Sequence, residues 1–132
     1  MYRKKIIVTG GAGYIGSHFC KLASKNKYDV VVVDNLLTGH EAFVKWGKLI
    51  KSDITNKEVF FNIVDQEKPD YVVHFAASAY VKESVENPLK YLSNNIGGID
   101  AIATTCSFFS IPIVFSSSCA VYGSVKKLPI TE

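Results

Sequence analysis

The stretch Val8-Thr9-Gly10-Gly11-Ala12-Gly13-Tyr14-Ile15-Gly16 decides the fold of this chain of 132 residues. It follows a short apolar run, residues 5–8, and it precedes a segment whose apolar residues recur at helical spacing. Glycines in this context permit a tight turn, let the backbone approach a ligand, and allow a helix to pack closely on a strand. The first N–H groups of the helix would then favour a phosphate. A strand–helix turn without any ligand is the alternative interpretation, so the downstream sequence has to distinguish the two.

An acidic residue at the end of the next apolar run supports the first interpretation. Asp34 closes residues 28–34, and a carboxylate at this place can accept hydrogen bonds from both hydroxyls of an adenosine ribose while repelling a 2′-phosphate. Asn35 follows, and Arg3 is the only arginine in the chain, so no arginine near Asp34 favours NADP. The sequence therefore predicts a dinucleotide site that prefers NAD to NADP. The alternative for Asp34 is a solvated carboxylate at a strand end.

Apolar runs alternate with helix-like segments along the rest of the chain. Further strands are expected at residues 48–50, 71–75 and 112–115, and runs that are apolar on both faces are typical of a buried parallel sheet. Helices are expected at 14–27, from about 56 until Pro69 closes it, with Thr55 or Asn56 as the cap, and at 88–109 with a weak point at Gly97-Gly98. This order predicts an α/β fold with a doubly wound, Rossmann-like parallel sheet and the strand order 3-2-1-4-5.

Composition excludes several classes of protein. Hydrophobic residues make up 48% of the chain, which excludes a disordered protein, and three cysteines exclude a disulfide scaffold. No apolar run approaches the roughly 20 residues of a membrane span, and no signal peptide is visible. The net charge of +3 is small and carried by scattered lysines, so no nucleic-acid partner is expected. We expect a cytoplasmic protein with reduced thiols, no membrane partner and no metal.

The remaining chemically active side chains indicate no second site. His74 lies inside an apolar run, where a structural role is expected, and Glu83 and Glu86 are expected on a loop, too close together for a general acid and base. Cys119 has no evident base partner, so we do not interpret it as a nucleophile.

Several motifs, taken in order, resemble the extended short-chain dehydrogenase/reductase family, and in particular the UDP-glucose (UDP-galactose) 4-epimerases. The resemblance covers essentially the whole chain, and the combination is far more specific than any single motif. The motifs are residues 9–18, Asp34-Asn35-Leu36, Asp53-Ile54, residues 74–77, Glu83-Ser84-Val85, Asn87-Pro88-Leu89, Asn94-Asn95, residues 115–118 and Val121-Tyr122-Gly123.

The resemblance implies that NAD is the cofactor and implies which residues bind it. Phe75 and Ile54 are alternatively core side chains, and Asp53 alternatively starts a helix. Ala79 departs from the family pattern, because several epimerases have a lysine there. The implied contacts are Gly10, Gly13, Tyr14, Ile15 and Gly16 at the pyrophosphate; Asp34, Asn35, Leu36, Leu37, Thr38 and Gly39 at the adenosine ribose and neighbouring phosphate; Asp53 and Ile54 at the adenine; Phe75, Ala76, Ala77, Ser78 and Ala79 beside the fourth strand; and Asn95 supporting that segment.

The resemblance also implies that Ser118 is catalytic, with a hydrogen bond to the reacting oxygen of the sugar and to a catalytic tyrosine. The alternative is an ordinary serine at the start of a loop. Family members place the tyrosine and a lysine in a Tyr-x-x-x-Lys motif on the next helix. Residues 122–126 match that pattern, but they follow Ser118 too closely, and Gly123 with Val125 makes a poor helix start. We therefore expect residues 1–132 to be an incomplete NAD-binding Rossmann domain, inactive alone, with the catalytic pair and the substrate domain lying further along.

For the full-length protein, the resemblance implies a homodimer that acts on a UDP-sugar. It would interconvert UDP-glucose and UDP-galactose, or the N-acetylated pair, through a 4-keto intermediate. The alternatives are another extended short-chain dehydrogenase acting on a nucleotide sugar (a decarboxylase, dehydratase or reductase) and a non-catalytic NAD-binding module. Dehydratases have Asp-Glu directly after the catalytic Thr, whereas this chain has Cys119-Ala120, which cannot transfer those protons.

Overall fold

A single parallel sheet forms the centre of the molecule. The computed structural model describes residues 3–125 and 127–131. Neighbouring strands are parallel throughout, and their order is β3-β2-β1-β4-β5, which confirms both the doubly wound fold and the predicted strand order. The strands are β1 (Lys5–Thr9), β2 (Asp29–Asp34), β3 (Lys48–Lys51), β4 (Tyr71–His74) and β5 (Ile113–Phe115).

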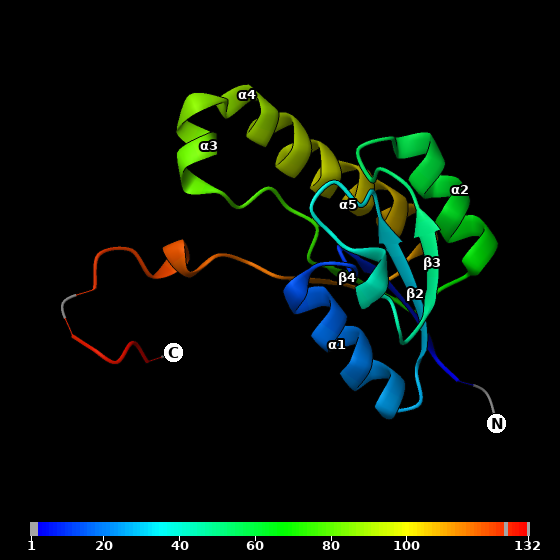
Figure 1. Cartoon of the computed structure of the whole chain (residues 1–132). Helices are drawn as coiled ribbons and strands as arrows, with labels where there is room; N and C mark the ends of the chain where they lie inside the picture. Colours follow the sequence, from blue (N-terminus) through cyan, green and yellow to red (C-terminus); the bar gives the residue numbers. More distant parts are fainter. Residues whose placement is uncertain (1–2, 126, 132) are drawn as a thin grey trace.

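Helices cover both faces of this sheet (Figure 1). Side chains alternate between the faces of a strand, so Val8 and Val32 pack with Cys20 of α1, whereas Ile7 and Val31 belong to the cluster that includes side chains of α2 and α5. The helices and helical turns are α1 (Tyr14–Lys25), η1 (Glu41–Phe43), α2 (Lys57–Glu67), α3 (Val81–Glu86), α4 (Pro88–Tyr91), η2 (Leu92–Ile96), α5 (Gly97–Phe109) and η3 (Cys119–Tyr122).

Local chemistry explains the ends of α2. The Oδ1 atom of Asn56 accepts a hydrogen bond from the N–H of Val59 at 3.2 Å, so Asn56 rather than Thr55 is the cap. At the other end, Lys68 adopts the left-handed conformation with φ of 49°. A left-handed residue is a common way to end a helix, and it stops α2 before Pro69.

One expectation about residues 81–109 is wrong and another is confirmed. Residues 81–86, which include Glu83 and Glu86, form α3 and not a loop. The helix expected from Pro88 to about Phe109 is present with those ends, as the continuous run of α4, η2 and α5. Its irregular part is the π-helical turn η2, which ends at Ile96, directly before the glycine pair. Gly98 allows a close approach, since a Cβ there would lie 2.9 Å from Cδ1 of Ile54.

Strand β5 lies at one edge of the sheet and is the most exposed of the strands. The side chains of Val114 and Phe115 are 58% and 55% exposed. After β5 the chain leaves the sheet and extends away from the body of the molecule (Figure 1). Within the described part of the chain, no helix is both long enough and apolar enough to cross a bilayer.

Candidate functional site

The glycine-rich turn between β1 and α1 lies at the carboxyl edge of the sheet and is packed on two sides. Gly10 has φ of +73°, and its N–H donates to the carbonyl of Val33 at 3.0 Å. A Cβ on Gly10 would lie 2.6 Å from the backbone nitrogen of Ala76, and one on Gly16 would lie 2.2 Å from the carbonyl oxygen of Gly10. The first contact joins the turn to the segment after β4, and the second joins α1 to the turn. Neither position can accept a side chain without a backbone shift.

The start of α1 has N–H groups that no side chain caps. Gly13 is the residue before the helix, it offers no side-chain hydrogen bond, and the first turn of α1 contains no acidic residue. The first hydrogen bond within the helix runs from the N–H of Ser17 to the carbonyl of Gly13 at 3.0 Å. Tyr14 and Ile15 are exposed on that turn. An anion placed here would meet backbone donors and the positive end of the helix dipole.

Asp34 at the end of β2 is buried, with 8% of its surface exposed, and both of its carboxylate oxygens are anchored. Its Oδ2 accepts from the N–H of Ala12 at 3.0 Å, and its Oδ1 accepts from the N–H of Leu36 at 2.9 Å. Gly39 approaches closely, because a Cβ there would lie 2.9 Å from Oδ1. Each oxygen can accept further hydrogen bonds. The carboxylate is thus fixed in place between the glycine turn and the loop after β2.

The loop after β2 is connected to the loop after β3. Asn35 donates from Nδ2 to Oδ2 of Asp53 at 3.3 Å, and its Oδ1 accepts from the N–H of Leu37 at 3.1 Å. Asp53 also accepts from the N–H and the hydroxyl of Thr55, at 2.9 and 2.7 Å. Burial raises the pKa of Asp53, but these hydrogen bonds outweigh it and bring the pKa below its ordinary value. Leu36 has a left-handed backbone with φ of 60°.

Two of the residues expected to contact the cofactor have side chains that pack in or against the core. Ile54 is buried in the cluster beneath α2 and α5. The ring of Phe75 packs against Phe19 with their centroids 5.4 Å apart. The alternative interpretation as a core residue therefore describes the side chain of Ile54, whereas Phe75 is only partly buried against its cluster. Ala77 and Ala79, in contrast, are exposed.

Asparagines from η2 hold the segment after β4. The Oδ1 of Asn95 accepts from the N–H of Ser78 at 2.8 Å, and its Nδ2 donates to the carbonyl of Ser78 at 3.1 Å. Asn94 donates to Oγ of Ser78 at 3.1 Å and to Oδ1 of Asn95 at 3.0 Å. The first pair of bonds satisfies both backbone groups of Ser78, so this segment has a fixed conformation.

Ser118 lies beyond the carboxyl end of β5 and is exposed. Its Oγ accepts a hydrogen bond from the N–H of Ala120 at 3.2 Å, which makes it the cap of η3. The Tyr-x-x-x-Lys pattern at residues 122–126 includes Lys126, which lies outside the described residues. The side chain of Cys119 also lies outside the described part of the chain. Tyr122 is exposed and belongs to η3, not to a following α-helix.

His74 is a structural residue of β4. It is buried, its Nδ1 lies 2.6 Å from Oγ1 of Thr9, and its ring stacks on Phe115 with the centroids 5.6 Å apart. Burial lowers the pKa of His74 below its ordinary value. The described residues contain no group of three His, Cys, Asp or Glu side chains placed to hold a metal.

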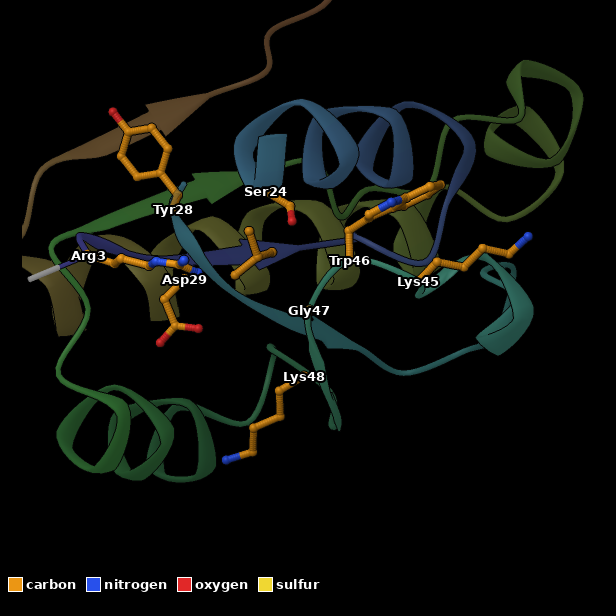
Figure 2. A pocket seen from close by; sticks show the side chains of 9 residues that line it. Arg3, Ser24, Tyr28, Asp29, Lys45, Trp46, Gly47 and Lys48 are labelled. Atoms are coloured by element: carbon orange, nitrogen blue, oxygen red, sulfur yellow. The ribbon is translucent and has the colours of Figure 1, made fainter. Parts of the chain in front are cut away.

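A hollow of about 650 Å³ lies at the opposite edge of the sheet, by the amino ends of β2 and β3 (Figure 2). Arg3, Trp46 and Lys48 are among the residues that line it. Figure 2 shows their side chains directed apart, and Lys48 forms an ion pair with Glu67 of α2. Ligands of doubly wound sheets bind at the carboxyl ends of the strands, so we do not assign this hollow to a cofactor.

Sequence reasoning missed three residues of the carboxyl edge. Asn94 fixes Ser78, and Tyr91 and Glu83 bond to each other beside the same segment. The one available signal was the pair of polar residues Asn94-Asn95 on a helix face that continues into the buried positions of α5.

A buried, anchored carboxylate at the end of β2, an uncapped helix start and a glycine turn at the carboxyl edge of a 3-2-1-4-5 sheet define a domain of the Rossmann class. Comparison with known proteins makes this more specific. The chain belongs to the NAD dependent epimerase/dehydratase family, whose model matches residues 6–132.

Curated relatives and solved crystal structures agree with this family assignment. UDP-glucose 4-epimerase of Lacticaseibacillus casei is 46% identical over 96% of this chain and 39% of its own length. A putative UDP-arabinose 4-epimerase of Arabidopsis thaliana is 39% identical over 96% of this chain and 33% of its own. The crystal structure of UDP-glucose 4-epimerase from Brucella ovis in complex with NAD superposes with a TM-score of 0.91 at 45% identity, covering 98% of this chain and 40% of that one. The chain thus spans about 40% of the length of such relatives.

Proposed function

We propose that residues 1–132 form the NAD-binding domain of a nucleotide-sugar 4-epimerase. The pyrophosphate binds at the glycine turn and the start of α1, the adenosine ribose at Asp34 and the loop 35–39, and the adenine beside residues 53–54. Residues 75–79 line the remaining part of the cofactor, and Asn95 supports them. For Ile54 the contact is made by the backbone, because its side chain is in the core, whereas the side chain of Phe75 is only partly buried.

The observation that carries this proposal is the anchored carboxylate of Asp34. Its two backbone bonds fix both oxygens before any ligand arrives, so little ordering is needed when two ribose hydroxyls bind. The same charge disfavours a 2′-phosphate, which supports NAD over NADP. The uncapped start of α1 and the two glycines that exclude a Cβ leave room for a pyrophosphate against backbone donors.

The reaction would be the inversion of one carbon of a UDP-sugar. NAD, when bound, supplies a hydride acceptor and donor for C4 of the sugar, in one round of oxidation and reduction. The contribution of this chain is to hold the cofactor at the carboxyl edge and to place Ser118 after β5 as a hydrogen-bond donor for the reacting oxygen. UDP-glucose and UDP-galactose are the proposed pair, and relatives named for glucose and for arabinose leave the choice of sugar to a substrate test.

We further propose a homodimer in the full-length protein, in the cytoplasm. Five apolar side chains of α3, α4 and η2 are exposed, and a monomer rarely leaves such a group uncovered. They are Val81, Val85, Leu89, Leu92 and Ile96. Since the relatives are longer than this chain, dimerisation is best measured in a chain extended to their length.

Cofactor binding tests the proposal directly. Titration of the chain with NAD in a calorimeter should show binding at one site, and NADP should bind more weakly. A chain that binds neither would contradict the proposal. Conversion of UDP-galactose, assayed for this chain and for one extended to the length of its relatives, separates an epimerase from a non-catalytic NAD-binding module.

A further inference from the structure

Three polar side chains reach from one face of the α4–η2 segment to the segment after β4. Tyr91 accepts from the N–H of Tyr80 at 3.1 Å, Asn94 donates to Oγ of Ser78 at 3.1 Å, and Asn95 binds both backbone groups of Ser78. A helix presents residues three and four apart on the same side, so positions 91, 94 and 95 meet one stretch of backbone. We call these three residues the clamp.

The hydroxyl of Tyr91 has its direction fixed by Glu83. A tyrosine hydroxyl carries one hydrogen, and an ionised carboxylate can only accept. Tyr91 therefore donates to Oε2 of Glu83 at 2.8 Å and presents a lone pair to the N–H of Tyr80. The other oxygen of Glu83 is bound by Lys90. The ammonium of Lys90 and the hydroxyl of Tyr91 lower the pKa of Glu83, which keeps it ionised at neutral pH.

The two asparagines of the clamp are adjacent in the sequence and also bond to each other. Here Asn94 lies in the π-helical turn η2 and bonds both to Ser78 and to the side chain of its neighbour Asn95. Single π-helical turns are rare and occur frequently at functional sites.

We propose that Tyr91 is a positioning residue: with its hydroxyl oriented by Glu83, it holds residues 78–80 against the bound cofactor, and Asn94 does the same through the hydroxyl of Ser78. The proposal rests on the proposed NAD site, because Ser78 and Ala79 belong to the wall of that site. Tyr91 itself touches no cofactor in this scheme. It acts on the cofactor only through the backbone that it fixes.

The test compares Tyr91→Phe with Tyr28→Phe in the chain of 132 residues. The first variant removes the clamping hydroxyl and keeps the ring, whereas the second removes a hydroxyl at the opposite edge of the sheet, beside the hollow of Figure 2. Amide hydrogen exchange followed by NMR reports on the N–H groups of Ser78 and Tyr80, and calorimetry reports on NAD. In Tyr91→Phe, loss of one hydrogen bond should accelerate exchange at Tyr80 and weaken NAD binding, each by about 3- to 10-fold. Tyr28→Phe should change neither.

A second pair keeps the test valid if Tyr91→Phe does not fold. Glu83→Gln retains an oxygen that can accept from Tyr91, whereas Glu83→Ala removes it. Glu83→Ala should reproduce the faster exchange and the weaker NAD binding, and Glu83→Gln should restore most of both. A general structural role would not separate these two variants in this way.

The outcomes distinguish the clamp from the cofactor site. Unchanged exchange at Tyr80 in both Tyr91→Phe and Glu83→Ala would overturn the clamp, and so would faster exchange with unchanged NAD affinity. Absence of NAD binding by the unaltered chain would instead contradict the proposed function, and with it the role of the clamp toward a cofactor.

Discussion

The two edges of the sheet hold their chain segments in different ways. At the carboxyl edge, Asp34 and Asn95 bind backbone groups of neighbouring loops, and the glycine turn packs directly on backbone. At the amino edge, side chains mostly bind side chains. Glu67 of α2 accepts from Lys5 at 3.0 Å and from Lys48, and Lys5 lies 3.8 Å from Asp29.

The two kinds of contact have different consequences for the position of a loop and for the stability of the fold. A backbone group cannot move without its neighbours, so side chains that bind backbone restrict the position of a whole loop. Long lysine side chains adapt, and exposed ion pairs contribute little because water and salt screen them. A ligand that must be oriented for chemistry therefore belongs at the carboxyl edge, and changes at the two edges should have unequal effects.

The largest effect is expected for Gly16→Ala at the carboxyl edge. The added Cβ would lie 2.2 Å from the carbonyl oxygen of Gly10, which is backbone and cannot move aside. We expect the free energy of unfolding to fall by about 3 kcal/mol and NAD binding to be lost. The matched control is Gly97→Ala, a helix glycine whose added Cβ would come no closer than 3.9 Å to Thr55. Denaturant unfolding should show that control to be neutral or slightly stabilising. Equal losses in the two variants would contradict the close packing of the turn.

The second largest effect is expected for Asp34→Asn, and it concerns the affinity for NAD more than the stability of the fold. Asp34 and Asp29 lie at the two ends of β2, and only Asp34 is anchored by Ala12 and Leu36. Asp34→Asn removes the charge and replaces one acceptor by an N–H₂ group. We expect NAD to bind about 10- to 100-fold more weakly, the value of one or more hydrogen bonds to a charged group, and the preference over NADP to shrink.

Calorimetric titration with both dinucleotides measures these changes. Asp29→Asn is the control, because it removes the same charge from the amino end of the same strand, where the side chain is largely exposed. If Asp29→Asn weakens NAD binding as much as Asp34→Asn does, the cofactor is not bound at the carboxyl edge.

The sheet could be predicted from the sequence because most of its strands are apolar and rich in β-branched residues, above all β2. Residues 30–33 are four valines, and such a run fits a strand covered on both faces. The turn and Asp34 were also recognisable, since the spacing of glycines and an acid reflects a backbone requirement. Those features depend on residues that are close in the sequence.

Helix α3 and the clamp were not recognisable because they depend on distant contacts. Residues 81–86 are too few to form a stable helix alone, and both valines of α3 are exposed, so no apolar pattern indicates it. It is joined to α4 by the bonds of Glu83 to Tyr91 and Lys90. The role of Gly98 was not recognisable for a similar reason, since it depends on the close contact with Ile54.

A smaller effect is expected from pH, through His74 at the carboxyl end of β4. Burial lowers its pKa in the folded chain below the ordinary 6.5, so the unfolded chain binds the proton more readily. The contribution of neutral His74 to the free energy of unfolding is therefore fully present above about pH 6.5, and it is lost progressively as the pH falls below that value. We expect the free energy of unfolding to be lower at pH 5 than at pH 7.

Denaturant unfolding at a series of pH values measures this loss. His74→Gln keeps an amide that can bond to Thr9 but removes the titration, so its stability should change less over the same range. A variant that loses stability with pH as steeply as the unaltered chain would show that His74 is not the responsible group.

The smallest effect is expected at the amino edge, and β3 offers a matched pair. Lys48 begins the strand and pairs with Glu67, whereas Lys51 ends it, with no ion pair among the described residues. Because the side chain of Lys48 is 63% exposed, we expect Lys48→Ala to lower the free energy of unfolding by only about 0.5 kcal/mol, with less effect at high salt, and to leave NAD binding unchanged. Lys51→Ala should be within error of the unaltered chain. A loss above about 1.5 kcal/mol in Lys48→Ala, or any change in its NAD affinity, would mean that the amino edge also fixes the geometry of the site.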